Sequence, residues 1–207
     1  MEIASLLTMS STAGLNAYIP VLVLGLLARY TSWVELAQSF TWLQHPFFLL
    51  TITILLVIEL TVDKFPLTDH INDVIQTLIR PLSGGIVGGS VASTTLSASP
   101  SAGKTVTAHG SAEVIFAIIV GVIVAFVVHS LKATSRPGIN VTTAGMGAPV
   151  VSTIGDVSSA GLSLLGIFFP ICALIVLCVV AAVLVYAFFA FWHLRHAKYR
   201  RDIFYDV

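Results

Sequence analysis

Two carboxylates one helical turn apart stand out in a chain that otherwise carries few charges. Glu59 and Asp63 close a long apolar stretch, and a helix would place residues four apart on one face. In a poor dielectric they would repel each other unless a proton, a cation or a basic group such as Lys64 lay between them. Ionisable residues inside membrane spans mark candidate functional sites. The pair therefore predicts a site for a cation or a small polar solute.

Asn16 and Asp156 are two further polar residues within apolar stretches. Asp156 is the lone acid of its stretch, and a lone carboxylate in hydrocarbon must be neutralised or matched. We expect its partner to be His129, Lys132, Arg136 or a bound cation. The candidate residues for binding a substrate or ion are Asn16, Glu59, Asp63 and Asp156. The sequence does not identify a metal.

Basic residues gather at matching depths of the predicted spans. His129, Lys132 and Arg136 follow one another at helical spacing, so they share one face. Such a face is either an ordinary anchor at the membrane boundary or a clamp for a phosphate or carboxylate group. With Lys64 and Arg80, these residues are candidates for binding a lipid headgroup or supplying counter-charge.

Composition limits which class of protein can carry these residues. Of the 207 residues, 57% are hydrophobic and only 10% are charged, whereas a soluble domain usually carries about 25% charged residues. The mean hydropathy is +0.97. The zero net charge argues against nucleic-acid binding. Without a familiar catalytic motif, we expect no enzyme and no cofactor.

The apolar stretches predict an all-α integral membrane protein with about six transmembrane helices, some short and broken by Gly or Pro. They form a single membrane domain, residues 1–207. The predicted spans are 11–29, 46–62, 81–98, 111–131, 140–166 and 168–193, followed by a basic cytoplasmic tail, 194–207. The fifth, rich in glycine, could instead be re-entrant.

A predicted amphipathic helix over residues 68–80 connects the second and third spans. Asp69, Asp73, Gln76 and Arg80 line one face, and apolar residues line the other. This pattern is typical of a helix lying at the cytoplasmic membrane interface. It is either a surface linker with a solvated acidic face or a gate in which Asp69 and Asp73 meet the mouth of a pathway.

The basic residues predict the orientation in the membrane. With six spans and a cytoplasmic N-terminus, the inner segments hold eight of the ten, which satisfies the positive-inside rule. These are Lys64, Arg80, Lys132, Arg136, Arg195, Lys198, Arg200 and Arg201, against Arg29 and Lys104 outside. We therefore expect a multi-pass protein with both termini in the cytoplasm.

Glycine patterns add two structural expectations. Gly84/Gly88 and Gly85/Gly89 form G-x-x-x-G pairs, which favour close helix packing or, alternatively, backbone approach to a ligand. Because six short spans enclose little volume, a homodimer with this glycine face as its seam is an open alternative. A weak internal echo also links residues 12–17 with 143–148, as in transporters with paired broken helices.

The ordered motifs resemble those of a bacterial membrane-protein family called domain of unknown function 4126. The similar segments are Ala13–Pro20, then Glu59 to Pro81 with Asp63-Lys64-Phe65-Pro66, then His129 to Asn140 followed by Ser152 and Asp156. Where the family pattern has an acidic pair, this chain has Gly155-Asp156. The resemblance implies a polytopic protein of the bacterial inner membrane and no established activity.

Three functions are compatible with these residues. The first is a small transporter or permease for a cation or small polar solute, with its carboxylates in a polar cavity open to the cytoplasm. The second is a protein that binds or translocates an anionic lipid of the inner leaflet. The third is a structural subunit whose polar residues only hold helices together. The lipid bilayer is the expected partner in each case.

Overall fold

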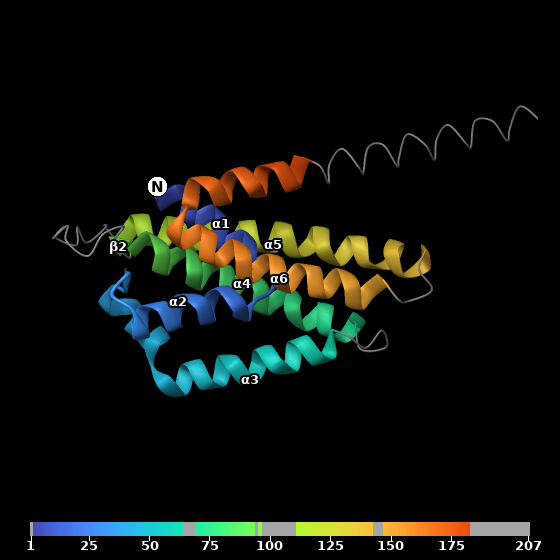
Figure 1. The fold of residues 1–207 in the computed structure, drawn as a ribbon, viewed down its shortest axis with the longest axis horizontal. Coiled ribbons are helices and arrows are strands. Elements are labelled where there is room, and N and C mark those ends of the chain that lie inside the picture. Colours follow the sequence, from blue (N-terminus) through green and yellow to red (C-terminus); the bar gives the residue numbers. More distant parts are fainter. Residues whose placement is uncertain (1, 64–68, 94, 97–110, 143–146, 183–207) are drawn as a thin grey trace, which may run out of the picture.

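The computed structural model describes residues 2–63, 69–93, 95–96, 111–142 and 147–182. These residues form helices that run mostly along one long axis (Figure 1). A single pair of short strands in this part of the chain, β1 (Val34–Glu35) and β2 (Thr95–Leu96), is antiparallel. The all-α prediction is confirmed.

The first predicted span, 11–29, is two helices instead of one. The helix α1 covers Glu2–Leu15, and α2 covers Tyr18–Tyr30. Figure 1 shows the chain turning back between them, so that the two helices run in opposite directions. With 14 and 13 residues, each is about 20 Å long, short of a hydrocarbon core of about 30 Å. We call this unit the α1–α2 hairpin and residues 14–18 its tip.

A 3-10 helix η1 (Gln38–Gln44) leads into α3 (Pro46–Val62), with a bend of 59° between them. The next helix, α4, runs without interruption over Asp69–Ser93 and contains Pro81. The sequence predicted a boundary there, between an interfacial helix 68–80 and a span 81–98. Proline removes one backbone hydrogen bond, but a helix can continue through it where neighbouring helices and local adjustment compensate.

Glycines let α4 pack closely against α5 (Ser111–Thr142). A Cβ added to Gly84 or Gly88 would collide with α5 backbone at Gly121 and Ala117, and one added to Gly85 or Gly89 would meet side chains of α5. The G-x-x-x-G pairs therefore serve helix packing, as predicted. The face that was also a candidate dimer seam is occupied within the chain.

Two helices complete the described chain. The helix α6 covers Gly147–Phe168, close to the predicted fifth span, and a helix over Pro170–Ala182 follows it. In Figure 1 this last helix turns back along the bundle. Among the described residues, two helices are long and apolar enough to cross a membrane, or three if η1 and α3 count as one bent span.

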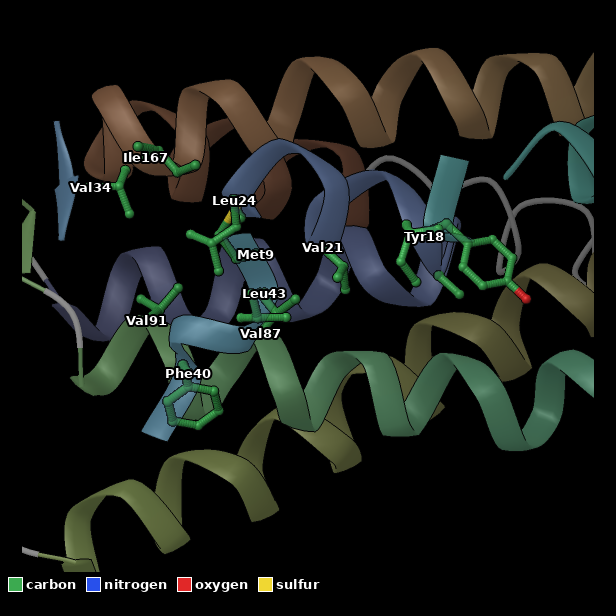
Figure 2. Close-up of a cluster of buried hydrophobic side chains, with 12 residues drawn as sticks. Met9, Tyr18, Val21, Leu24, Val34, Phe40, Leu43, Val87, Val91 and Ile167 are labelled. Carbon is green, nitrogen blue, oxygen red and sulfur yellow. The ribbon is translucent and has the colours of Figure 1, made fainter. Parts of the chain in front are cut away.

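A hydrophobic cluster packs the hairpin against its neighbours and reaches the tip at Ala17 and Tyr18. Met9 of α1 and Leu24 of α2 meet Val87 of α4, and Ile167 of α6 joins them (Figure 2). Burying a side chain of this size contributes about 1.5–3 kcal/mol relative to exposure in water. The cluster fixes the hairpin between α4 and α6.

The distribution of polarity is inverted relative to a soluble protein. Gln76 and Arg80 of α4 are buried, whereas Val74 and Leu78 of the same helix are each 72% exposed. The predicted apolar stripe of this helix thus faces outward, and part of its polar face points into the bundle instead of water. Together with the candidate spans, this exterior indicates a membrane protein.

Candidate functional site

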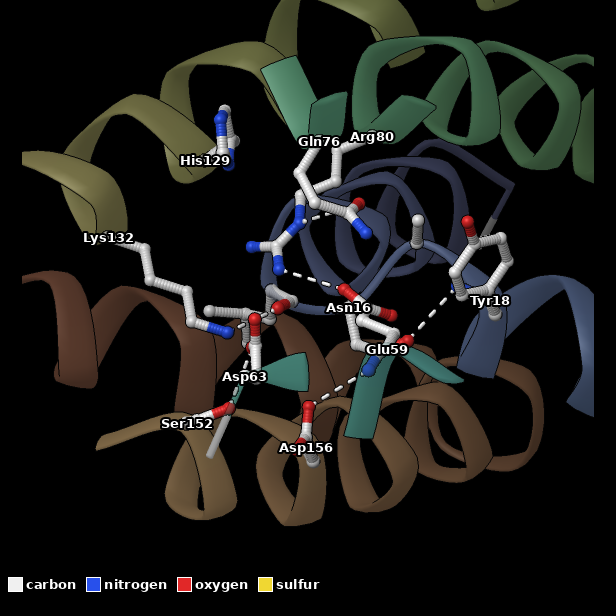
Figure 3. Close-up of polar contacts among 12 residues, drawn as sticks. Asn16, Tyr18, Glu59, Asp63, Gln76, Arg80, His129, Lys132, Ser152 and Asp156 are labelled. Atoms are coloured by element: carbon white, nitrogen blue, oxygen red, sulfur yellow. Dashed lines mark hydrogen bonds and ion pairs between the residues drawn. The ribbon is translucent and has the colours of Figure 1, made fainter. Parts of the chain in front are cut away.

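The tip of the α1–α2 hairpin lies at the centre of a buried polar network (Figure 3). Asn16 is fully buried. Its Oδ1 accepts hydrogen bonds from the backbone N–H groups of Tyr18 at 3.0 Å and Ile19 at 3.2 Å. Asn16 therefore caps α2 in the way asparagine caps helices generally. The cap satisfies two backbone amides at the start of α2.

Arg80 stabilises the other side of the tip, where α1 ends. Its Nη1 donates to the carbonyl of Gly14 at 3.0 Å, and its Nη2 donates to Oε1 of Glu59 at 2.9 Å. Its Nε donates to Oε1 of Gln76 at 3.3 Å. With 1% of its surface exposed, this guanidinium joins α1, α3 and α4.

Lys132 of α5 reaches the same end of α1. Its Nζ donates to the carbonyl of Leu15 at 2.7 Å. A Cβ added to Gly155 of α6 would lie 3.0 Å from this Nζ, so the lysine passes directly over a glycine. Carbonyls at a helix C-terminus carry partial negative charge and attract cations. Arg80 and Lys132 thus compensate the C-terminal end of α1.

Glu59 and Asp63 are both buried on one face of α3's end, as their spacing predicted. Asp63 accepts a hydrogen bond from the hydroxyl of Ser152 at 2.7 Å. Glu59 is paired with Arg80 through Oε1, but no donor among the described residues lies within reach of its Oε2. One carboxylate oxygen in the interior is therefore left without a described partner.

Asp156 of α6 accepts a hydrogen bond from Nδ2 of Asn16 at 2.9 Å. The sequence predicts a partner among His129, Lys132, Arg136 or a bound cation, and Lys132 does interact electrostatically with Asp156. The described hydrogen-bond donor is instead a neutral amide, because the break between α1 and α2 turns Asn16 toward α6. The predicted ligand candidates Asn16 and Asp156 are thus brought together by a hydrogen bond.

The remaining predicted residues fall into two groups. Nε2 of His129 lies 3.1 Å from the hydroxyl of Thr77, so this histidine connects α5 to α4 near the network. Lys64 lies outside the residues that the structure describes. Asp69, Asp73 and Arg136 lie in described helices, but their side chains are outside the description.

The inward orientation of Arg80 and Lys132 bears on the headgroup interpretation. Both side chains are buried and bound to carbonyls of the tip. In the structure, their described contacts are with carbonyls of the tip and, for Arg80, also with Glu59 and Gln76.

Several residues of the network were missed from the sequence. Ser152 appeared only as part of a family motif, and Gln76 only as part of a polar face. Gly155 and Tyr18 were not singled out, yet the Tyr18 side chain lies close to Gln76 and Glu59. A polar residue every fourth position on an otherwise apolar helix would have indicated Gln76, but no pattern marks a glycine that leaves room for a lysine.

The network places three carboxylates and two basic side chains around the tip. They come from four helices: α3 supplies Glu59 and, at its C-cap, Asp63, whereas α4 supplies Arg80, α5 supplies Lys132 and α6 supplies Asp156. Among the described residues, no three His, Cys, Asp or Glu side chains are grouped so that they could hold a metal ion. The arrangement concentrates charged side chains of both signs around a buried helix break.

Comparison with known proteins gives one match. No curated protein and no solved structure is detectably similar to the chain. The match is to the family model described as Domain of unknown function (DUF4126), and it covers residues 3–190. That range includes every residue of the network around the tip. The chain therefore belongs to the DUF4126 family.

Proposed function

We propose that the protein is a small membrane transporter or permease for a cation or small polar solute, and that its binding region is the tip of the α1–α2 hairpin. The observation that carries this proposal is the buried helix break surrounded by Glu59, Asp63 and Asp156. Ionisable side chains inside an apolar bundle are costly, and they commonly mark ion or substrate pathways.

The hairpin itself supports the same function. Transporters commonly bind their substrates and ions where discontinuous helices end inside the protein, because exposed helix ends present partial charges. Irregular backbone at membrane depth is tolerated where protein or a water-filled cavity surrounds it. Here the carbonyl end of α1 faces Arg80 and Lys132, and the amide end of α2 faces Asn16 and, through it, Asp156. A solute cation would replace or rearrange these side chains.

The proposal is tested by uptake of radiolabelled Na⁺, Rb⁺ and choline into proteoliposomes, with protein-free liposomes as background. Asp156→Asn removes a charge beside the tip while retaining a side-chain oxygen that can accept from Asn16. We expect wild-type uptake of at least one probe and background uptake for this variant. The control is Glu113→Gln, which removes an exposed carboxylate from α5. This variant should leave uptake unchanged. Background uptake of all three probes by the folded wild-type protein would contradict cation transport.

A further inference from the structure

Glu59 differs from the other carboxylates around the tip. Asp63 is bound by Ser152, and Asp156 is bound by Asn16. Glu59 is 3% exposed, and its Oε1 is bound by Arg80. Its Oε2 lies in the interior without a donor among the described residues. A buried carboxylate oxygen without a donor loses its hydration and gains nothing in return.

The charges around Glu59 leave room for one more positive charge. Arg80 of α4 and Lys132 of α5 act on it favourably, whereas Asp63 of α3 acts against it, and Tyr18 of α2 lies beside it. Asp156 of α6 belongs to the same group of interacting charges. Within the described chain, three carboxylates thus face two basic side chains, and a buried cluster is most stable when its charges balance.

We propose that Glu59 is the proton-binding site of this transporter, where a proton on Oε2 and the guanidinium of Arg80 compete for one carboxylate. The proposal rests on the transport function above and names the coupling ion. The proton adds to Oε2 and forms an O–H bond, which converts the carboxylate to a neutral carboxylic acid. The ion pair between Arg80 and Glu59 thereby becomes a weaker hydrogen bond from Nη2 to the neutral acid's Oε1, while Arg80 keeps its hydrogen bond to Gly14.

The structure indicates which helix responds. Most of α3 is exposed, with Phe47 and Ile58 among its outward-facing residues. In Figure 1, α3 lies along the edge of the bundle. Its C-terminal half is tied to the bundle by the Glu59–Arg80 ion pair and, one turn later, by Asp63 and Ser152. Protonation of Glu59 weakens the first of these ties from an ion pair to a hydrogen bond with a neutral acceptor, and this should loosen this half of α3.

The experiment observes Glu59 without changing it. The chain has four glutamates: Glu2, Glu35, Glu59 and Glu113. The variant E2Q/E35Q/E113Q, labelled with ¹³C at the glutamate side-chain carboxyl carbon and placed in lipid nanodiscs, gives one carboxyl NMR signal. We expect this signal to titrate. Hydrogen–deuterium exchange of α3, corrected for the intrinsic effect of pH, should increase over the same pH range as the proton is taken up.

Two results would overturn the proposal. One is a carboxyl signal that does not move with pH while the protein stays folded. The other is a signal that titrates without any change in exchange of α3. Glu59→Gln, a neutral mimic of the protonated state, should show increased exchange of α3 at every pH, and Glu113→Gln should behave like wild type. Should Glu59→Gln fail to fold, the labelled triple variant still decides. A titrating Glu59 without uptake of any probe cation would contradict transport but not the proton site.

Discussion

Asn16 joins the break between α1 and α2 to a carboxylate of α6: its Nδ2 donates to Oδ1 of Asp156 at 2.9 Å. The oxygen of the same amide caps α2 through the N–H groups of Tyr18 and Ile19. One side chain thus satisfies a helix end and an acid that lies within the bundle. Neither aspartate nor a hydrophobic residue can do both, because aspartate lacks the donor and a hydrophobic residue lacks both groups.

Substitutions of Asn16 should separate these two roles. Asn16→Ala removes the cap and the bond to Asp156, and we expect the free energy of unfolding to fall by about 2–3 kcal/mol. Asn16→Ser keeps an oxygen that can cap α2 but is too short to replace the bond to Asp156, so it should lose roughly 1 kcal/mol less. Denaturant titration in mixed micelles measures both. Equal losses in the two variants would show that the cap contributes nothing.

Two glycines provide a matched test of the helix packing. A Cβ on Gly84 would collide with Ala125 and Gly121 of α5, whereas a Cβ on Gly161 of α6 would meet nothing within 4 Å. Gly84→Ala should therefore lower the free energy of unfolding by about 1–3 kcal/mol through overpacking. Gly161→Ala should be neutral or raise it by up to about 1 kcal/mol, since alanine favours a helix. The same unfolding assay compares them, and similar effects at both sites would contradict the packing of α4 on α5.

The sequence predicted the helical class and most of the polar network, but not the path of the chain. Glu59 and Asp63 were predictable because helical spacing and local hydropathy mark them. The reversal between α1 and α2 was not, since Gly14, Asn16 and Pro20 are compatible with a kinked single span as well as with a hairpin. What decides between them is tertiary: α4, α5 and α6 supply partners for the helix ends.

The case of Arg80 shows the same limit on a smaller scale. Its position next to Pro81 and on a polar helix face predicted the boundary of an interfacial helix. In the structure α4 continues through Pro81, and Arg80 points into the bundle. A helix face that is polar for a short stretch can face water or a buried partner, and the partner, Glu59, lies on another helix. Sequence periodicity alone gives no information on that choice.

Asp63→Asn should distinguish a transport site from a structural tie. The asparagine oxygen can still accept from Ser152, so we expect the protein to fold with a loss of at most about 1–2 kcal/mol, as for replacing a charged hydrogen bond by a neutral one. If Asp63 takes part in transport, uptake of the probe cation should fall to background in the folded fraction. Ser152→Ala retains the charge and provides the control. Normal uptake by Asp63→Asn at reduced thermal stability would assign Asp63 a structural role.

The direction of the hairpin leads to a final prediction, on topology. Gly166 of α6 lies against Met9, and Asp156, ten residues earlier, binds Asn16, so α1 runs antiparallel to α6. Trp33, just after α2, stacks edge-to-face on Phe168. The chain thus enters at the Phe168 end of α6, turns at the tip, and returns to that end.

A hairpin that returns to its own side does not cross the membrane. The N-terminus of this chain should then lie on the same face as residues 31–45, opposite to Lys132, whereas six full spans would place it with Lys132 in the cytoplasm. The positive-inside rule allows either, because no Lys or Arg precedes Arg29. Reporter fusions before Glu2 and at Lys104 should therefore both report the outer side, and a fusion after Val207 the cytoplasmic side. A cytoplasmic signal before Glu2, with the other two fusions as expected, would restore a crossing within residues 2–30 and contradict the hairpin.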